Sequence, residues 1–295
     1  MRFSGRSSPR VRLAPHEFRL MCDLINVHCG LHFDDSGIYL FERRLAERVA
    51  ALELSSFDEY YKYLRFNVNG PRELEDAIEL LTTKETYFFR QEYQLRAFQK
   101  ELLPRIAKTN GASKQVTVWS AGCSSGEEVY TIAMLMVESG ALYNWDMRVV
   151  GSDLSRHNVA TARRGVYRGA SFRTIPEDVM KRYFGEVADG YQVVDSIRRM
   201  CHFGQLNLLD SVRASNVGRV DVIFCRNVLI YFDEQKKKRV IDTLYQRLVP
   251  GGYLLLGHSE SLLNVSTAFE LVHLKEDLVY RKPQLTRNWD FNGYL

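Results

Sequence analysis

The chain has 295 residues, which is enough for one large domain or two modest ones, each with its own apolar core. Its residues are 45% hydrophobic and 26% charged, and the net charge of +4 is too small to indicate nucleic-acid binding. The five cysteines lack metal-ligand spacing, so we expect reduced thiols and no metal site. No signal segment or long apolar run occurs, which predicts a cytoplasmic protein that is neither exported nor inserted in a membrane.

The first part of the chain has the periodicity of helices. Apolar residues recur at i, i+3, i+4 and i+7 in four segments, over residues 15–30, 38–54, 56–64 and 74–81. Ser56 and Glu59 form a capping box at the start of the third segment. We therefore predict an all-α domain over residues 12–95, preceded by a flexible lead at 1–11.

The second helical segment carries an arginine stripe, which we define as Arg43, Arg44 and Arg48. These arginines lie off the apolar face, and Arg44 and Arg48 are one turn apart. The stripe can serve as a cationic docking surface. Alternatively, Glu42 and Glu47 pair with it inside the helix and leave a solvated face of mixed charge.

An aromatic connector, residues 81–90, follows the helices without a clean periodicity. It has two interpretations, a packed linker or a segment that covers a site in the next domain.

The sequence then changes to strand, small-residue turn and helix. Residues 116–119 form a short β-rich run, 120–126 are small residues, and helical spacing resumes at Glu127. A turn of this kind lets a ligand approach the backbone closely. Glu127 and Glu128 disfavour a diphosphate ligand, although carboxylates at a helix start also have a purely structural use as partners of the helix dipole.

Strands and helices alternate through the rest of the chain, which predicts a parallel sheet covered by helices over residues 96–284. In such sheets a ligand lies beyond the carboxyl ends of the strands. Residues 166–205 interrupt the alternation, and within them 191–194 and 200–203 predict a small antiparallel appendage. Residues 269–273 and 278–281 predict a closing hairpin before a flexible tail at 285–295.

Asp153 comes at the end of a predicted strand, where a carboxylate can accept hydrogen bonds from both hydroxyls of a ribose. A small-residue loop without a phosphate-binding lysine accompanies it. Together they favour an adenosyl ligand that has no diphosphate, namely S-adenosylmethionine.

Six stretches, in the right order, resemble the CheR family of chemotaxis receptor methyltransferases. They are TTKETYFFR (82–90), SAGCSSGEEVYTIA (120–133), SDLS (152–155), NLL (207–209), FCRNVLIYFD (224–233) and GGYLLLGHSESL (251–262). The resemblance implies an α/β fold of the class I S-adenosylmethionine methyltransferases (Rossmann-like) with a small antiparallel β subdomain, at about 166–205, preceded by an all-α N-terminal domain. The implied activity is methyl transfer to glutamate side chains on the cytoplasmic domains of chemoreceptors, by an enzyme that we expect to be a monomer.

The resemblance also implies roles for individual residues. Arg90 and Tyr231 would hold the reacting groups, and Arg43, Arg44 and Arg48 would dock on the receptor. The residues that would bind the cofactor are Lys84, Thr86, Arg90, Ala121, Gly122, Glu127, Glu128, Asp153, Asn207, Leu208, Arg226 and Asn227. One departure concerns Lys84, because the family usually carries Asn there.

The chemistry of the implied reaction needs positioning more than proton transfer. A glutamate carboxylate is already ionised at neutral pH, so no general base is required. It must lie in line with the bond to the methyl group. A tight ion pair would stabilise the ground state more than the transition state, which favours Tyr231 as a neutral orienting group.

Two other functions stay open. One is methylation of a small molecule or a nucleic-acid base, although residues 226–229 lack the prolines of amine-directed DNA enzymes. The other is a non-catalytic module that senses S-adenosylmethionine or S-adenosylhomocysteine.

Part of the family binds a pentapeptide tether of the receptor, and those members carry a longer loop in the appendage. The short connection between 191–194 and 200–203 therefore predicts that this enzyme does not need the tether. The tail residues Asn288–Phe291 resemble a tether loosely, a four-residue match that we attribute to chance.

Overall fold

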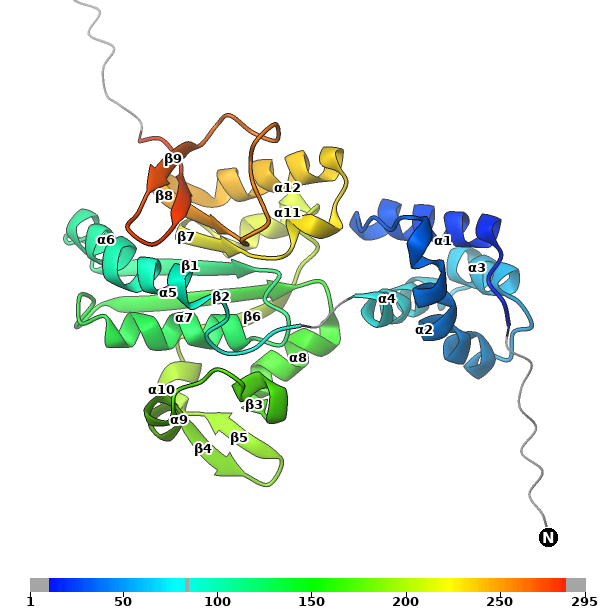
Figure 1. The fold of residues 1–295 in the computed structure, drawn as a ribbon, viewed down its shortest axis with the longest axis horizontal. Helices are drawn as coiled ribbons and strands as arrows, with labels where there is room; N and C mark the ends of the chain where they lie inside the picture. Colours follow the sequence, from blue (N-terminus) through cyan, green and yellow to red (C-terminus); the bar gives the residue numbers. More distant parts are fainter. Residues whose placement is uncertain (1–10, 83–84, 285–295) are drawn as a thin grey trace, which may run out of the picture. The chain divides into compact units, whose positions relative to one another are not determined.

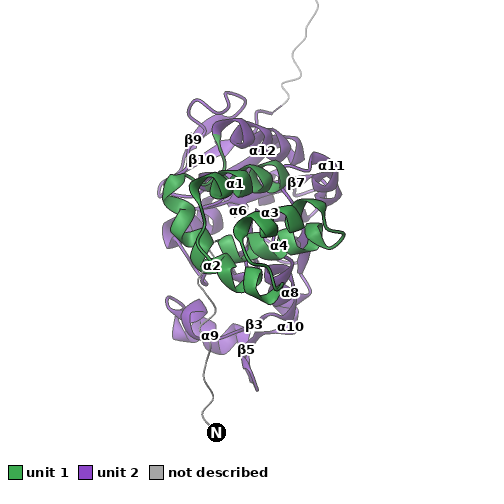
Figure 2. Ribbon diagram, turned by 90° about the vertical axis from the view of Figure 1, so that its right-hand side faces the viewer, with its two compact units in different colours: residues 1–84, 231–233 green, residues 85–230, 234–295 purple. Residues whose placement is uncertain are grey.

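The computed structural model describes residues 11–82 and 85–284. Lys84, both tails and residues 288–291 lie outside the described residues. The chain forms two compact units (Figure 2), which we call the helical unit, residues 1–84 with 231–233, and the sheet unit, residues 85–230 with 234–295. The division falls after residue 84, whereas we placed the domain boundary at 95. Leu95 and Phe98 are buried in the core of the sheet unit, which explains the difference.

The described part of the helical unit contains the four predicted helices (Figure 1), which are α1 (Pro15–Cys29), α2 (Ile38–Ala51), α3 (Phe57–Phe66) and α4 (Gly70–Leu81). α1 ends at Gly30, which has a left-handed φ of 81°. α3 begins at Ser56, whose hydroxyl accepts the N–H of Glu59 at 3.1 Å. The Glu59 carboxylate accepts the N–H of Ser55 at 2.7 Å, so the predicted capping box closes one residue earlier than in the usual motif.

The described part of the sheet unit is organised around a seven-stranded sheet (Figure 1) in the order β6-β2-β1-β7-β8-β10-β9. Its strands are β1 (Gln115–Ala121), β2 (Asp146–Asp153), β6 (Cys201–Gln205), β7 (Val220–Cys225), β8 (Leu248–Leu256), β9 (Glu270–His273) and β10 (Leu278–Arg281). The strands from β6 to β8 are parallel, and β10 and β9 form the predicted antiparallel hairpin at the edge. The parallel α/β prediction is therefore confirmed.

Helices cover both sides of this sheet. The crossovers from β1 to β2 and from β2 to β6 run in the opposite direction to that from β7 to β8, so right-handed connections put their helices on opposite faces. The helices of six or more residues in the described part of the sheet unit are α5 (Glu92–Ala97), α6 (Leu103–Thr109), α7 (Glu127–Glu138), α8 (Arg156–Arg164), α9 (Glu177–Tyr183) and α12 (Glu234–Arg247). A π-helical stretch at Phe98–Leu102 joins α5 to α6. Figure 1 shows α7 and α12 on opposite sides of the sheet.

The antiparallel appendage exists, but one of its predicted strands was wrong. It consists of β3 (Val166–Tyr167), β4 (Phe184–Val187) and β5 (Gly190–Val193), in the order β3-β5-β4. Residues 201–203 of the predicted strand 200–203 belong to β6 at the edge of the main sheet, parallel to β2. His202 is exposed and Gly204 is half-buried, so this edge strand lacks the alternation of apolar residues that marks a strand of the main sheet.

Candidate active site

The carboxyl ends of three adjacent parallel strands meet at one edge of the sheet, where β2, β1 and β7 end at Asp153, Ala121 and Cys225. From β1 the chain continues to β2 and β6 on one side, whereas from β7 it continues to β8 on the other. The switch point is therefore between β1 and β7, and ligands bind at such points. The predicted residues Gly122, Glu128, Asp153 and Asn227 all follow or begin segments at this edge.

The turn after β1 has no room for larger side chains. The N–H groups of Gly122 and Cys123 donate to the carbonyl of Ser152 at 2.8 and 2.9 Å. Gly122 has a φ of 82°, and a Cβ atom there would lie 2.4 Å from Cγ2 of Val228. Gly122 is therefore required by both its conformation and its neighbour.

Ser124 lies in the same turn and was not among the predicted site residues. Its N–H donates to Oδ2 of Asp153 at 2.7 Å, and its φ of 49° is left-handed. The Ser124 hydroxyl is buried and has no hydrogen-bond partner among the described residues. A buried hydroxyl that lacks a partner is costly, so it marks a position where a bound ligand would supply one.

The Asp153 carboxylate is oriented by the backbone around it. In addition to Ser124, it accepts the N–H of Ser155 at 2.9 Å and Nδ2 of Asn158 at 3.2 Å, both through Oδ1. Ser155 also caps α8, as the sequence predicted. Donors of this kind favour the ionised carboxylate, which suits the predicted acceptor role at the end of β2.

Glu127 is almost fully buried, with 2% of its surface exposed. Its carboxylate accepts the hydroxyls of Ser125 at 2.8 Å and Ser171 at 2.9 Å, and the side chain of Thr86 is near enough to favour its charged form. Burial raises the pKa of Glu127 above its ordinary value. The structure thus brings Thr86 and Glu127 together, and Glu127 fixes the connector rather than presenting a free carboxylate.

Arg226 ties the end of β7 to the connector and to α7. Its Nη1 lies 3.0 Å from Oε2 of Glu128, and its Nη2 donates to Oε1 of Gln91 at 2.8 Å and to the carbonyl of Arg90. Ser120 completes the cluster by donating to Oε1 of Glu128 at 2.7 Å. Arg226 and Glu128, both predicted to bind the cofactor, are therefore engaged with the protein, and Gln91 was missed because a lone glutamine carries no sequence signal.

Left-handed backbone conformations of non-glycine residues gather at this edge. Phe89, Gln91, Ser124 and Asn227 have φ values of 60°, 59°, 49° and 58°. Such conformations cost about 1–3 kcal/mol each and persist only where the surroundings enforce them. These four residues come from three segments, the connector with the residue that follows it, the turn after β1 and the loop after β7, and such a concentration is typical of a functional site.

The connector is packed by its aromatic residues and also reaches the site. The Phe88 ring is buried and contacts the rings of Tyr167, Phe172 and Phe184 at centroid distances of 5.0 to 5.5 Å. Next to it, Nη1 of Arg90 donates to the carbonyl of Glu85 at 2.7 Å. The interpretation as a packed segment therefore holds for Phe88, whereas the interpretation as a cover of a site stays a prediction.

Asn207 and Leu208 follow β6, and so the corrected position of that strand explains their place at the carboxyl edge. The side chain of Asn207 accepts the N–H of Leu209 at 3.0 Å, and Leu208 is buried. Leu206 donates through its N–H to the carbonyl of Asp153 at 2.9 Å, which joins this segment to the end of β2.

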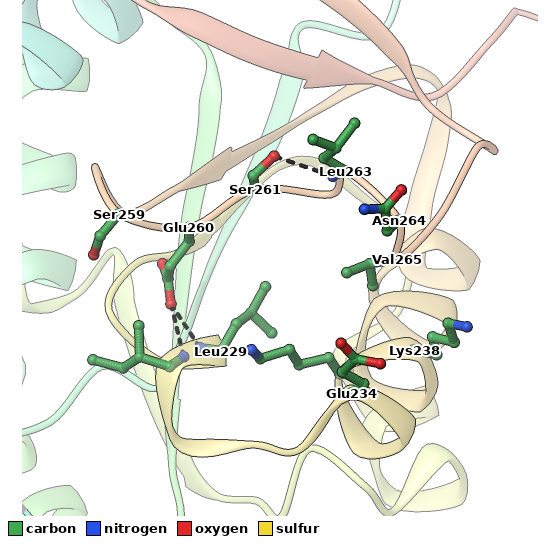
Figure 3. Close-up of a pocket in the computed structure, with 11 residues that line it drawn as sticks. Leu229, Glu234, Lys238, Ser259, Glu260, Ser261, Leu263, Asn264 and Val265 are labelled. Atoms are coloured by element: carbon green, nitrogen blue, oxygen red, sulfur yellow. Dashed lines mark hydrogen bonds between the residues drawn. The ribbon is translucent and has the colours of Figure 1, made fainter.

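Glu260 organises the loop after β7, and it is not among the residues predicted for the site. Among the described residues, its carboxylate accepts five backbone N–H groups, from residues 227, 228, 229, 230 and 257, at 2.7 to 3.3 Å. Figure 3 draws two of these bonds at Leu229 and its neighbour. Asn227 takes its left-handed conformation within this loop. The only sequence signal was an acidic residue inside a motif otherwise made of small and apolar residues.

Tyr231 and the arginine stripe belong to the helical unit. The carbonyl of Tyr231 accepts the N–H of His32 at 2.8 Å. Arg44 donates to the carbonyls of Leu80 and Thr82 at 2.6 and 3.2 Å and so caps α4.

Arg48 has a buried partner in α4. Its Nε donates to Oε1 of Glu73 at 2.9 Å, its Nη2 pairs with Oε2, and the Tyr60 hydroxyl donates to Oε1 at 2.7 Å. The alternative pairing of the stripe with Glu42 and Glu47 is not found among the described residues, where Glu42 accepts the N–H of Leu13. Of the three arginines, only Arg43 is exposed and lacks a hydrogen bond or ion pair among the described residues.

No group of three His, Cys, Asp or Glu side chains in residues 11–82 and 85–284 could hold a metal ion. No helix in these ranges is long and apolar enough to cross a membrane.

Comparison with known proteins gives consistent matches over nearly the whole chain. Residues 16–82 match the CheR methyltransferase all-alpha domain, and residues 84–278 match the CheR methyltransferase SAM-binding domain. Chemotaxis protein methyltransferase 2 of Vibrio cholerae is 37% identical over 86% of this chain and 88% of that protein. The chemotaxis protein methyltransferase of Vibrio parahaemolyticus is 33% identical over 92% and 98%, and chemotaxis protein methyltransferase 1 of Pseudomonas aeruginosa is 32% identical over 90% and 97%.

The fold and the matched domain define a methyltransferase of class I fold whose cofactor is S-adenosylmethionine. The chain belongs to the CheR methyltransferase family. The predicted fold class, cofactor and enzyme class are confirmed.

Proposed function

We propose that this enzyme transfers the methyl group of S-adenosylmethionine to glutamate side chains on the cytoplasmic domains of chemoreceptors, and that it acts in the cytoplasm as a monomer. Membership of the CheR family supports this function. The observation that carries the cofactor site is the buried, unpartnered Ser124 hydroxyl beside Asp153 at the switch point of the sheet.

The residues at this edge fit S-adenosylmethionine in their chemistry. Asp153 supplies a charged acceptor for ribose hydroxyls, Ser124 supplies a hydroxyl, and Gly122 leaves the backbone accessible. The guanidinium of Arg226 is already engaged, and a diphosphate would meet the carboxylates of Glu127 and Glu128. We assign to the cofactor Ser124 and the residues predicted from the sequence, which are Lys84, Thr86, Arg90, Ala121, Gly122, Glu127, Glu128, Asp153, Asn207, Leu208, Arg226 and Asn227.

The hydrogen bonds and ion pairs of these residues indicate two different roles. Asp153, Ser124 and Asn207 would hold the cofactor directly, whereas Arg226, Glu128 and Glu127 act by fixing the backbone around it. The bond from Arg226 to the carbonyl of Arg90 holds the base of the Arg90 side chain. A misplacement of this backbone would be costly, since the reaction depends on alignment.

The bound cofactor supplies an electrophilic methyl group on a sulfonium. The protein need not remove a proton, because the acceptor glutamate is ionised at neutral pH. Arg90 and Tyr231 would orient the reacting groups as hydrogen-bond donors. A donor that binds the carboxylate too strongly would stabilise the ground state, so the neutral hydroxyl of Tyr231 suits the acceptor.

The appendage supports an enzyme that does not need a receptor tether. The connection that matters is the one between β4 and β5, which is only Ala188–Asp189. The connection between residues 191–194 and 200–203, from which the sequence predicts tether independence, is not a hairpin, because residues 201–203 pair with β2 in the main sheet. Tether independence is therefore proposed from the two-residue turn between β4 and β5.

Two measurements test the proposed function together. Titration calorimetry with S-adenosylhomocysteine should give a single binding site, and radiolabelled methyl groups should pass to purified cytoplasmic fragments of chemoreceptors as base-labile esters. Binding without any transfer to receptor fragments would instead indicate a non-catalytic sensing module.

A further inference from the structure

A hollow of about 290 Å³ lies in the sheet unit beside the loop that Glu260 holds. Figure 3 shows the segment 259–265 on one side of it and the start of α12 on the other. The loop after β7 forms its floor through Leu229 and Ile230. The hollow is therefore built from segments that follow β7 and β8.

Its position places it next to the proposed transfer site. β7 and β8 are parallel neighbours, so the segments after them lie at the same carboxyl edge as the turn after β1. Ile230, in the floor, is three residues after Asn227 and directly precedes Tyr231. A chain segment bound in the hollow would lie against the loop that carries these residues.

The lining combines apolar surface with positive charge. Ile230 and Leu263 both line the hollow and are 49% and 78% exposed, so they offer apolar surface to a partner. Lys237 and Lys238 line the opposite side and form no ion pair within the described ranges. They belong to the basic run Lys236–Arg239 at the start of α12.

Two acidic residues also line the hollow, and neither forms an ion pair with Lys237 or Lys238 among the described residues. The Glu260 carboxylate is occupied by five backbone N–H groups of the described residues. Glu234 is the other acidic residue of the lining, against two lysines. The surface thus complements a segment that presents apolar side chains together with carboxylates.

We propose that this hollow docks the acidic, amphipathic receptor helix that carries the acceptor glutamate. The proposal rests on the proposed function, because it takes its occupant from that substrate. An amphipathic helix places apolar anchors at i and i+3 or i+4 toward a groove, where Ile230 and Leu263 would receive them. Lys237 and Lys238 would pair with carboxylates on the flank of the helix.

The test is methylation kinetics on a receptor cytoplasmic fragment that the unaltered enzyme methylates. The double variant Lys237→Glu with Lys238→Glu removes two attractions and adds two repulsions, so we expect the KM for the fragment to rise roughly tenfold. The turnover number at saturating fragment and the affinity for S-adenosylhomocysteine should stay unchanged. Leu263→Ser, at a highly exposed position, should raise the same KM several-fold without loss of thermal stability.

The matched control is Lys100→Glu with Lys108→Glu, which makes the same change in net charge. Both lysines are exposed, and α6, which contains Lys108, leads to the amino end of β1, away from the carboxyl edge. An unchanged KM in the α12 variant, or an equal rise in the control, would overturn the proposal. A failure of the proposed function is distinct, because the unaltered enzyme would then methylate no receptor fragment.

Discussion

The guanidinium of Arg226 lies 3.0 Å from the carboxylate of Glu128, and the two side chains are only 2% and 17% exposed. This pair joins the end of β7 to the first turn of α7. Because Arg226 also bonds to Gln91 and to the carbonyl of Arg90, the pair sets the backbone of the connector. The ion pair thus links the fold of the sheet unit to the position of a reacting group.

Removal of one partner should be much more harmful than removal of both. We expect Arg226→Leu to cost about 3–5 kcal/mol of the free energy of unfolding, because it leaves a buried carboxylate unpaired. The double variant Arg226→Leu with Glu128→Leu should cost less than the sum of the two single changes. Urea denaturation of the four proteins measures this coupling, and strict additivity would contradict it.

Ser124 and Asp153 provide a direct test of the cofactor site. Asp153→Ala should weaken S-adenosylhomocysteine binding by roughly 10- to 100-fold, since hydrogen bonds to charged groups contribute about 1.5–3 kcal/mol. Ser124→Ala should weaken it by roughly threefold to tenfold, as expected for a neutral hydrogen bond.

The serine variant has a second signature. The Ser124 hydroxyl is buried without a partner, so its removal should leave the stability of the ligand-free protein unchanged or higher. Calorimetric affinity and thermal unfolding of the same preparations check both statements. A less stable Ser124→Ala variant with normal affinity would show that the hydroxyl has only a structural role.

Arg90→Ala and Tyr231→Phe should reduce the rate of methyl transfer more than the affinity for the cofactor, if these residues orient the reacting groups. Single-turnover methylation at saturating cofactor isolates the transfer step. Tyr130→Phe is a suitable comparison, because its hydroxyl donates to the carbonyl of Ala162 inside the core. Equal losses in affinity and rate for Arg90→Ala would reduce its role to holding the cofactor.

The sequence predicted the elements that carry local signals. The small-residue turn, the Ser155 cap and the stop at Gly30 each have a short-range physical cause, and all three occur as expected. β6 was assigned to the wrong sheet because pairing of a short edge strand depends on tertiary context rather than on its own pattern.

The sequence did not predict the contacts that site residues make with residues from distant parts of the chain. The sequence identified Asp153 and Arg226 as site residues. It did not predict that Arg226 contacts Gln91 and the carbonyl of Arg90. The role of Glu260 was also hidden, because four of its five partners among the described residues are backbone N–H groups 30 to 33 residues earlier along the chain, and backbone groups leave no trace in side-chain types.

The buried carboxyl of Glu127 predicts a pH dependence of stability. Burial raises its pKa in the folded protein. Between its unfolded and folded pKa values the folded state binds more protons than the unfolded state, so stability is lost as pH rises through this window. Glu127→Gln cannot titrate, and the stability of the unaltered protein relative to this variant should therefore fall from acidic to neutral pH.

Glu59 offers a control of opposite sign. Hydrogen bonding from Ser55 lowers the pKa of Glu59, so its contribution is lost as pH falls. The stability of the unaltered protein relative to Glu59→Gln should then rise with pH over the acidic range. Denaturation curves at a series of pH values test both, and parallel curves for the unaltered protein and Glu127→Gln would refute the first prediction.

The arginine stripe gives the last prediction, because its members differ in their contacts. Arg43 is exposed and has no partner among the described residues, whereas Arg48 pairs with buried Glu73. If the stripe docks on the receptor, Arg43→Glu should slow association with a receptor fragment at low ionic strength, with less effect at high salt. Its thermal stability should not change, since an exposed charge without a partner contributes little to folding.

Arg48→Glu should instead destabilise the helical unit by roughly 2 kcal/mol or more, because it places a second carboxylate against Glu73. Any loss of methylation in that variant would then follow from unfolding and would say nothing about docking. Association rates by stopped flow, with thermal unfolding of each variant, separate the two effects. A normal association rate for Arg43→Glu at low salt would leave the stripe with a structural role only, through Arg44 at the end of α4 and Arg48 at Glu73.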